Sequence, residues 1–336
     1  MASYFITGIA GFLGNNLVKE ILAADPAADI VGFVQIGDPC IYLDKERIRL
    51  IEGDLFDLES IERFLSTPAK DGKRNLIHAA GRISVYRSND PLTTKVNVEG
   101  TKNVLNAALS HHIDRFVFVS SVDALSKVEM GKKILEQKTY DPDGLEGVYS
   151  KSKALASNLV LEARHSGMET LVVLPSAILG PNDPGRSPIN DAIARFLKGK
   201  LPAVVKGAYD LVDVRDVAKG IVLVLAQGQS GESYLLTGNH CEVIDLIGLA
   251  AEYSGKKPVR LKVPTFLVKM ASPFIEFHAR KRRKTPLFTS FAIDCLRQNS
   301  DYCHDKASSL GYQPRPLTKT VEDTVAWMKD SGYLEQ

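Results

Sequence analysis

The first 175 residues alternate short apolar runs with longer amphipathic stretches. The runs that predict strands are YFIT, DIVGFV, IRLIEGD, NLIHAAG, RFVFVSS and TLVVLPS. The stretches that predict helices between them are FLGNNLVKEILAA, LESIERFLS, NVEGTKNVLNAALSHH and SKALASNLVLEARHS. Strands and helices that alternate at this spacing predict an α/β fold, a doubly wound parallel sheet with helices on both faces. IHAAG and FVFVSS are apolar at nearly every position, as strands buried on both faces should be.

The pattern changes after TLVVLPS. A stretch rich in Gly, Pro and Ser follows, and most of the later apolar segments have helical periodicity. We therefore expect residues 1–175 to form the sheet domain, with residues 210–238 returning to it. Residues 176–209 and 239–336 should form a smaller, mostly helical lobe that binds the substrate.

Composition narrows the class of protein. The 336 residues are more than one compact core usually holds, and 44% hydrophobic and 24% charged residues are ordinary for a globular protein. A net charge of +2 argues against nucleic acid as the main partner. The four cysteines have neither CxxC spacing nor nearby histidines in a ligand pattern, so we predict reduced thiols and no metal site.

Two segments bear on location. The chain begins with the strand pattern SYFIT and shows no export signal, which predicts a cytoplasmic protein. The apolar segment VPTFLVKMASPFIEFH is too short to span a bilayer and is interrupted by Lys269 and Pro273, although it could lie on a membrane surface. The basic run 280–284 could contact anionic lipid or nucleic acid, but a solvated helix end is the favoured interpretation.

A glycine-rich turn follows the first predicted strand. In TGIAGFLGNNL, Gly8, Gly11 and Gly14 permit a sharp turn and the close approach of a pyrophosphate to the backbone. The helix that follows would offer its free N–H groups to the phosphates. We predict a dinucleotide site here that also includes Phe12 and Leu13. A tight turn without a ligand is the alternative.

Further candidate residues lie where predicted strands end. Each of them could be an ordinary capping or turn residue. Together they mark the edge where an open parallel sheet binds its ligand. The residues assigned to this edge are Asp54 and Leu55 beside the adenine, Ala79 and Ala80, Ser120 and Ser121, and Pro175 and Ser176.

The stretch GVYSKSKA contains one tyrosine followed by two lysines. If the helix begins near Tyr149, residues four apart share a face, so Tyr149 and Lys153 are neighbours and Lys151 points away. A buried aromatic residue followed by a solvated basic turn would have the same pattern. The segment alone leaves both interpretations open.

The motifs in their order resemble a known family. TGIAGFLG, GDL, HAAG, NVEGT, FVFVSS and YSKSK are similar to those of extended short-chain dehydrogenase/reductases. PSAILGP, LVDVRDVAKGI and KASSLGYQPRPL resemble the branch that holds dihydroflavonol reductases and 3β-hydroxysteroid dehydrogenases. The resemblance implies a Rossmann fold, an NAD(P)(H) cofactor and oxidoreductase chemistry.

The resemblance also assigns catalytic roles. Tyr149 matches the family's acid/base tyrosine, and Lys153 matches the lysine that favours the phenolate and holds the nicotinamide ribose. Ser121 matches the serine that hydrogen-bonds the substrate oxygen, and Asn97 would steady the lysine through water. The chemistry agrees, because a tyrosine with a pKa of ~10 is a poor base unless a cation stabilises its phenolate.

Three departures from the family patterns bear on the substrate. Ala177 replaces the asparagine typical of nucleotide-sugar epimerases, Tyr209 replaces their diphosphate-binding arginine, and Val122-Asp123 replaces the Asp-Glu of sugar dehydratases. We therefore expect a hydrophobic secondary alcohol or ketone, steroid- or flavonoid-like. A nucleotide-sugar epimerase or dehydratase is the alternative. The apolar residues expected to line the site, each of which could equally be core, are Ile83, Val85, Tyr86, Val122, Leu125, Ile178 and Leu179.

A protein that binds a dinucleotide without catalysis is a further alternative, but the intact Tyr149 and Lys153 argue against it.

Cofactor choice depends on the end of the second strand, where an acidic residue would favour NAD. Gln35 occupies this position, and the missing carboxylate slightly favours NADP(H). NAD stays an alternative because Asp38 follows three residues later. By analogy with relatives, helices 98–112 and 149–165 could form a homodimer interface.

Overall fold

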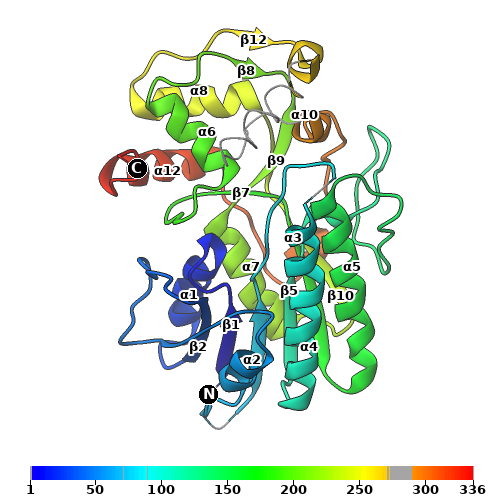
Figure 1. Ribbon diagram of the computed structural model, residues 1–336. Coiled ribbons are helices and arrows are strands. Elements are labelled where there is room, and N and C mark those ends of the chain that lie inside the picture. Colours follow the sequence, from blue (N-terminus) through cyan, green and yellow to red (C-terminus); the bar gives the residue numbers. More distant parts are fainter. Residues whose placement is uncertain (1, 71, 89, 271, 273–289, 336) are drawn as a thin grey trace.

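The computed structural model describes residues 2–335 except 71, 89, 271 and 273–289. The basic run 280–284 therefore lies outside the described residues. The fold consists of a large parallel sheet covered on both faces by helices, with a smaller lobe at one edge of that sheet (Figure 1).

The central sheet confirms the prediction of a doubly wound fold. Its seven strands are all parallel, in the order β10-β6-β5-β4-β1-β2-β3. The order reverses between β1 and β4, and parallel sheets bind ligands at such a switch point. The strands are β1 (Ser3–Thr7), β2 (Asp29–Gln35), β3 (Arg49–Gly53), β4 (Arg74–His78), β5 (Arg115–Val119), β6 (Glu169–Pro175) and β10 (Glu232–Leu236).

Two hydrophobic cores lie on opposite faces of this sheet. Successive strand residues point to opposite faces, so Phe5 of β1 packs into one core and Ile6 into the other. One face is covered by α1 (Phe12–Ala24) and α7 (Val214–Gln227), and the other by α2 (Leu58–Leu65), α4 (Thr101–Ser110) and α5 (Val148–Glu162). The connecting turns are α3 (Pro91–Thr94), the π-helical η1 (Lys95–Gly100), and the 3₁₀ turns η2 (Val122–Ala124) and η3 (Ala163–Ser166).

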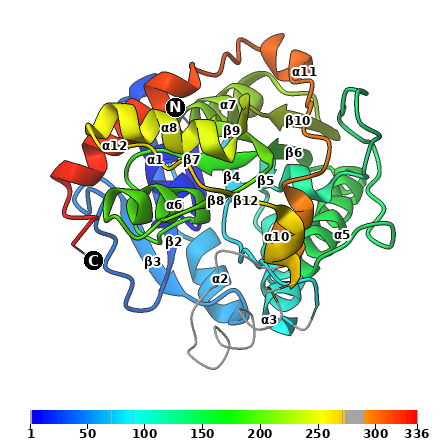
Figure 2. The ribbon, with the colours of Figure 1, turned by 90° about the horizontal axis from the view of Figure 1, so that it is seen from above.

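The smaller lobe lies over the carboxyl edge of the sheet (Figures 1 and 2). It contains two small sheets, β11-β9-β7 and β12-β8. Their strands are β7 (Ala177–Leu179), β8 (Val204–Val205), β9 (Ala208–Asp213), β11 (Asn239–Glu242) and β12 (Lys262–Val263). The described helices are α6 (Pro188–Leu197), α8 (Val243–Ser254), α10 (Ser290–Cys295), α11 (Asp305–Ser308) and α12 (Leu317–Asp330).

The segment 210–238 is shared between the two parts. Strand β9 pairs with β7 and β11, whereas β10 pairs with β6 and α7 packs against α1. The return to the central sheet therefore begins at α7. The domain boundaries at residue 175 and beyond stay a prediction.

Charged residues at the start of α7 tie this helix to the lobe. Asp213 accepts a hydrogen bond from the Arg215 amide (2.8 Å) and forms an ion pair with its guanidinium (2.7 Å). Arg215 also pairs with Asp323 of α12 (2.8 Å), and Arg315 pairs with Asp216 (2.8 Å). A charge-assisted network of this kind fixes the helix relative to the lobe.

None of the helices in the described part of the chain is both long and apolar enough to cross a bilayer. All four cysteines are free. Helices α4 and α5 pack side by side on one face of the sheet, so the helices expected to form a homodimer interface are neighbours. Dimerisation stays a prediction.

Candidate active site

The glycine-rich turn forms a tight junction between β1 and β4. Gly8 has φ +69°, and a Cβ there would lie 2.7 Å from the Ala80 nitrogen. A Cβ on Gly14 would lie 2.2 Å from the Gly8 carbonyl oxygen. Helix α1 starts at Phe12 with no side-chain cap and no acidic residue in its first turn, so no carboxylate opposes an anion there. These features fit the pyrophosphate of a dinucleotide.

The other predicted cofactor residues lie at the ends of neighbouring strands. Gln35 ends β2 with an exposed side chain, and Pro175 ends β6, followed by the buried Ser176. Asp54 is exposed, and its carboxylate accepts a hydrogen bond from the Phe56 amide (2.9 Å). Leu55, Ala79, Leu13 and Gly11 occupy the same edge, because all these strands are parallel. The structure thus brings the candidate residues together, while their cofactor contacts stay a prediction.

Helix α5 separates the two lysines as the spacing predicts. Lys151 is exposed, whereas Lys153 is only 5% exposed. The Lys153 ammonium donates a hydrogen bond to the Val119 carbonyl oxygen (2.8 Å) and lies 4.8 Å from the centre of the Phe118 ring. Burial lowers the pKa of Lys153 to about 7. The side chain therefore reaches the carboxyl end of β5, at the edge of the sheet where the cofactor is expected.

The ionisation of Tyr149 bears on its predicted role. Burial raises the pKa of this phenol above its ordinary value, the charge of Asp123 raises it further, and a hydrogen bond with Ser121 opposes the shift. The Lys153 ammonium donates to the Val119 carbonyl oxygen, and its lowered pKa of about 7 leaves the lysine neutral in the range where this phenol would ionise. In this structure the phenol is therefore held neutral, and the nearby charge that acts on it is the carboxylate of Asp123.

Asn97 holds the backbone beside the lysine. Its side-chain oxygen accepts from the Arg82 amide (2.8 Å), and its side-chain nitrogen donates to the Arg82 carbonyl (3.0 Å) and to the Ser152 hydroxyl (2.9 Å). These bonds fix the chain at Gly81, where an added Cβ would lie 3.1 Å from the Lys153 nitrogen. Asn97 thus shapes the space around Lys153. The predicted link through water stays a prediction.

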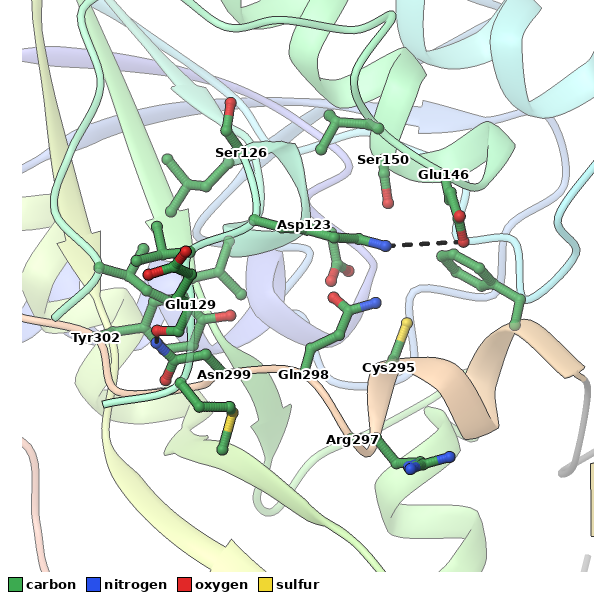
Figure 3. A pocket seen from close by; sticks show the side chains of 18 residues that line it. Asp123, Ser126, Glu129, Glu146, Ser150, Cys295, Arg297, Gln298, Asn299 and Tyr302 are labelled. Atoms are coloured by element: carbon green, nitrogen blue, oxygen red, sulfur yellow. Dashed lines mark hydrogen bonds and ion pairs between the residues drawn. The ribbon is translucent and has the colours of Figure 1, made fainter. Parts of the chain in front are cut away.

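A cavity of about 260 Å³ is lined by Asp123 and Ser150, among others (Figure 3). These residues follow Ser121 and Tyr149 closely in the chain, but Ser121 and Tyr149 do not themselves line the cavity. Of the expected lining residues, the described part of the chain contributes Val122 and Leu125. Ile83 is instead 61% exposed, and Leu179 is fully buried in the core between α6 and α8, because β7 pairs with β9. Ile178 packs into the core of the central sheet, and Val85 and Tyr86 are not part of the lining.

The cavity is also more polar than predicted. Charged or amide side chains from two distant segments line it beside the apolar ones, as Figure 3 shows. They include Lys127, Glu129 and Glu146 after η2 and before α5, and Arg297, Gln298 and Asn299 after α10. Burying charged groups without polar partners is unfavourable, so a ligand bound in this cavity would need polar groups facing this part of its surface.

Asp123 is the functional candidate that sequence reasoning missed. Its side chain is exposed to the cavity, yet protein atoms surround it, and this burial raises the pKa of its carboxyl. Ser121 donates a hydrogen bond to the Asp123 carboxylate (3.3 Å) and accepts one from the Asp123 amide (3.2 Å). The available signal was its position two residues after Ser121, where Val122-Asp123 replaces the Asp-Glu of sugar dehydratases.

Comparison with known proteins agrees with this geometry. Residues 4–237 match the NAD dependent epimerase/dehydratase family. The chain belongs to this family. The resemblance inferred from the motifs is therefore confirmed, and with it the Rossmann fold and the class of NAD-dependent oxidoreductases, epimerases and dehydratases.

Relatives of this family member match along nearly its whole length. Sterol demethylase protein B of Methylococcus capsulatus is 30% identical over 334 residues, covering 98% of this chain and 99% of that protein. A putative dihydroflavonol 4-reductase of Synechocystis is 27% identical over 337 residues, covering 99% and 96%. The crystal structure of gox2253 is 28% identical with a TM-score of 0.82, covering 98% of each chain.

Proposed function

We propose that the protein is an NAD(P)-dependent oxidoreductase that interconverts a secondary alcohol and a ketone on a hydrophobic small molecule. The observation that supports this most is the placement of Tyr149 beside Ser121, with Lys153 one helical turn away on α5. This group lies at the carboxyl edge of the sheet, where the glycine-rich turn fits a dinucleotide.

Each residue has a role in this proposal. The nicotinamide cofactor supplies or accepts the hydride. Tyr149 gives a proton to the carbonyl oxygen during reduction, and its raised pKa keeps it protonated for that step. Ser121 donates a hydrogen bond to the same oxygen. Lys153 holds the nicotinamide ribose, and Asn97 holds the backbone beside that lysine.

The alternative of a nucleotide-sugar epimerase or dehydratase has less support. Tyr209 lies on β9, and burial followed by the charges of Cys295 and Asp123 raises the pKa of its phenol. A neutral phenol at the position expected for an arginine cannot form a bidentate contact with a diphosphate. The two relatives described above, a sterol demethylase protein and a putative dihydroflavonol reductase, also support a substrate without a nucleotide.

The redox balance of turnover tests the proposal. An oxidoreductase consumes or forms one equivalent of NAD(P)H per substrate, whereas an epimerase or dehydratase returns its cofactor to the starting state. We expect nicotinamide absorbance to change when hydrophobic ketones or secondary alcohols are added with NADH, NADPH or the oxidised forms. Conversion of UDP-glucose, UDP-galactose or GDP-mannose without a net absorbance change would refute the proposal. Cofactor binding without any turnover would support the non-catalytic alternative.

Cofactor preference should respond to residue 35. Gln35→Asp should shift kcat/KM toward NADH, because a carboxylate repels the 2′-phosphate, and Gln35→Arg should shift it toward NADPH. One feature opposes the proposed preference for NADP(H). Glu52 on β3 accepts a hydrogen bond from the Gly37 amide (3.5 Å), and its carboxylate adds negative charge near the end of β2, which disfavours a 2′-phosphate. Unchanged NADPH/NADH ratios in both variants would show that this strand end does not contact the ribose.

A further inference from the structure

His78, the last residue of β4, is a fully buried polar side chain that takes no part in the proposed chemistry. Its ring stacks on the Phe118 ring, with the two centroids 5.8 Å apart. Both ring nitrogens have partners: Nδ1 lies 2.6 Å from the Thr7 hydroxyl oxygen, and Nε2 lies 3.0 Å from the Thr101 hydroxyl oxygen. The ring therefore bridges the end of β1, which leads into the glycine-rich turn, and the start of α4.

The directions of these hydrogen bonds follow from the number of hydrogens available. The Thr101 hydroxyl donates its single hydrogen to the Asn97 carbonyl oxygen (2.7 Å), so it can only accept from His78. Nε2 of His78 therefore carries a hydrogen. Burial, followed by the charge of Lys153, lowers the pKa of His78 to about 3, so the ring is neutral and Nδ1 accepts the hydrogen of Thr7. All donors thus point in one direction, from the Thr7 hydroxyl to the Asn97 carbonyl.

The two ends of this chain of hydrogen bonds lie at different parts of the predicted cofactor site. The Thr7 hydroxyl accepts a hydrogen bond from the Ala80 amide (3.3 Å), and a Cβ on Gly8 would lie 2.7 Å from the same Ala80 nitrogen. At the other end, the Asn97 side chain holds the backbone that lies against Lys153. The first end therefore bears on the pyrophosphate, and the second bears on the nicotinamide ribose.

We propose that His78 is a positioning residue that fixes the glycine-rich turn relative to Lys153, so that one dinucleotide can be held at its pyrophosphate and its nicotinamide ribose together. This inference rests on the cofactor site of the proposed function. Because His78 is fully buried, it acts through Thr7 and Thr101 rather than by contact with the cofactor. A rigid ring with a nitrogen toward each partner sets the distance between two elements, which a flexible side chain would not.

Two substitutions separate the pyrophosphate arm of this chain, Thr7 to His78, from its ribose arm, His78 to Thr101. The amide oxygen of asparagine falls near the position of Nδ1, so His78→Asn can still accept from Thr7 but loses the bond to Thr101. The amide nitrogen of glutamine falls near the position of Nε2, so His78→Gln can still donate to Thr101 but loses the bond from Thr7. Thr101→Val and Thr7→Val remove the same two arms from their other ends.

Calorimetric binding of ADP and ADP-ribose to the whole chain measures both arms without turnover. ADP carries the pyrophosphate, and ADP-ribose adds the ribose that Lys153 is proposed to hold. The ratio of the Kd of ADP to the Kd of ADP-ribose therefore reports the ribose contact.

The variants should change these two quantities separately. Loss of the ribose arm, in His78→Asn and Thr101→Val, should lower the ratio about fivefold and leave the Kd of ADP nearly unchanged. Loss of the pyrophosphate arm, in His78→Gln and Thr7→Val, should raise the Kd of ADP about fivefold and leave the ratio nearly unchanged. The size of each effect is that of one lost buried hydrogen bond.

Thr324→Val is the matched control for Thr101→Val. Thr324 is also fully buried in a helix, α12, and its hydroxyl also donates to the carbonyl oxygen four residues earlier, that of Thr320 (2.6 Å). The control should lower the free energy of unfolding by a similar amount but change neither Kd.

Equal losses of both quantities in His78→Asn and His78→Gln would show that His78 only stabilises the sheet, and would overturn the inference. A native ratio near one, or unchanged Kd values in all four variants, would also overturn it. If the His78 variants fail to fold, Thr7→Val and Thr101→Val decide the same question. Separate effects on the two Kd values, in a protein that turns over no substrate, would refute the proposed function and leave this inference intact.

Discussion

Replacing Tyr149 with phenylalanine should lower turnover by about 10²-fold or more while leaving cofactor affinity nearly unchanged. The magnitude is that of lost acid–base catalysis by a positioned side chain. Only the hydroxyl is removed, and the partly buried ring stays on α5. Because burial and Asp123 raise the pKa of Tyr149, we also expect carbonyl reduction by the native protein not to decline through loss of this proton between pH 6 and 9.

Tyr140→Phe provides a matched control. It makes the same change at a buried tyrosine whose hydroxyl hydrogen-bonds Ser233 (2.7 Å). Its expected effect is a loss of about 1 kcal/mol in the free energy of unfolding, with little change in kcat. Steady-state kinetics and a cofactor titration of both variants provide the measurement. Equal losses of kcat in the two would exclude a catalytic role for Tyr149.

Replacing Lys153 with methionine should abolish most activity and weaken cofactor binding, yet make the folded protein more stable. Burial lowers the pKa of this lysine from its ordinary 10.5 to about 7, which means that folding disfavours its charge. Methionine removes that penalty, although it also removes the hydrogen bond to Val119. After that loss, we expect a net gain on the order of 2 kcal/mol or more in the free energy of unfolding at neutral pH.

The sign of the pH dependence follows from the same shift. Below about pH 7 the lysine is protonated in both the folded and the unfolded state, so the full penalty applies. Between about pH 7 and 10.5 the unfolded state binds more protons than the folded state, and the stability of the native protein rises. The free energy of unfolding of Lys153→Met should therefore exceed that of the native protein most below pH 7, and this difference should shrink toward pH 10.5. Denaturant unfolding of both proteins at several pH values measures the difference.

Lys151→Met is the control for this experiment. The same substitution two residues earlier removes an exposed lysine, so it should change neither activity nor cofactor affinity, and stability only slightly. If Lys151→Met proved as damaging as Lys153→Met, the assignment of the lysine would be wrong. A destabilised Lys153→Met protein would show instead that the ammonium stabilises the fold through Val119.

The sequence by itself determined the fold and the position of the candidate site. Alternating apolar runs and helical stretches predicted the parallel sheet, because strands buried on both faces require apolar residues at nearly every position. Helical periodicity predicted the helix at GVYSKSKA and the different directions of Lys151 and Lys153, and the resemblance to the family selected Lys153 as the functional lysine. Family motifs at strand ends identified the edge of the sheet where the site is proposed.

Only the tertiary structure decided what surrounds that site. The cavity is lined by the turn after β5 and by residues after α10, segments more than 150 positions apart whose contact no local pattern records. Ile83 and Leu179 have similar hydrophobicity, yet one is exposed and the other fully buried. Likewise, the burial that holds the phenol of Tyr149 neutral, and the carboxylate of Asp123 beside it, depend on distances through space, because desolvation and charge interactions depend on neighbours in three dimensions rather than on sequence order.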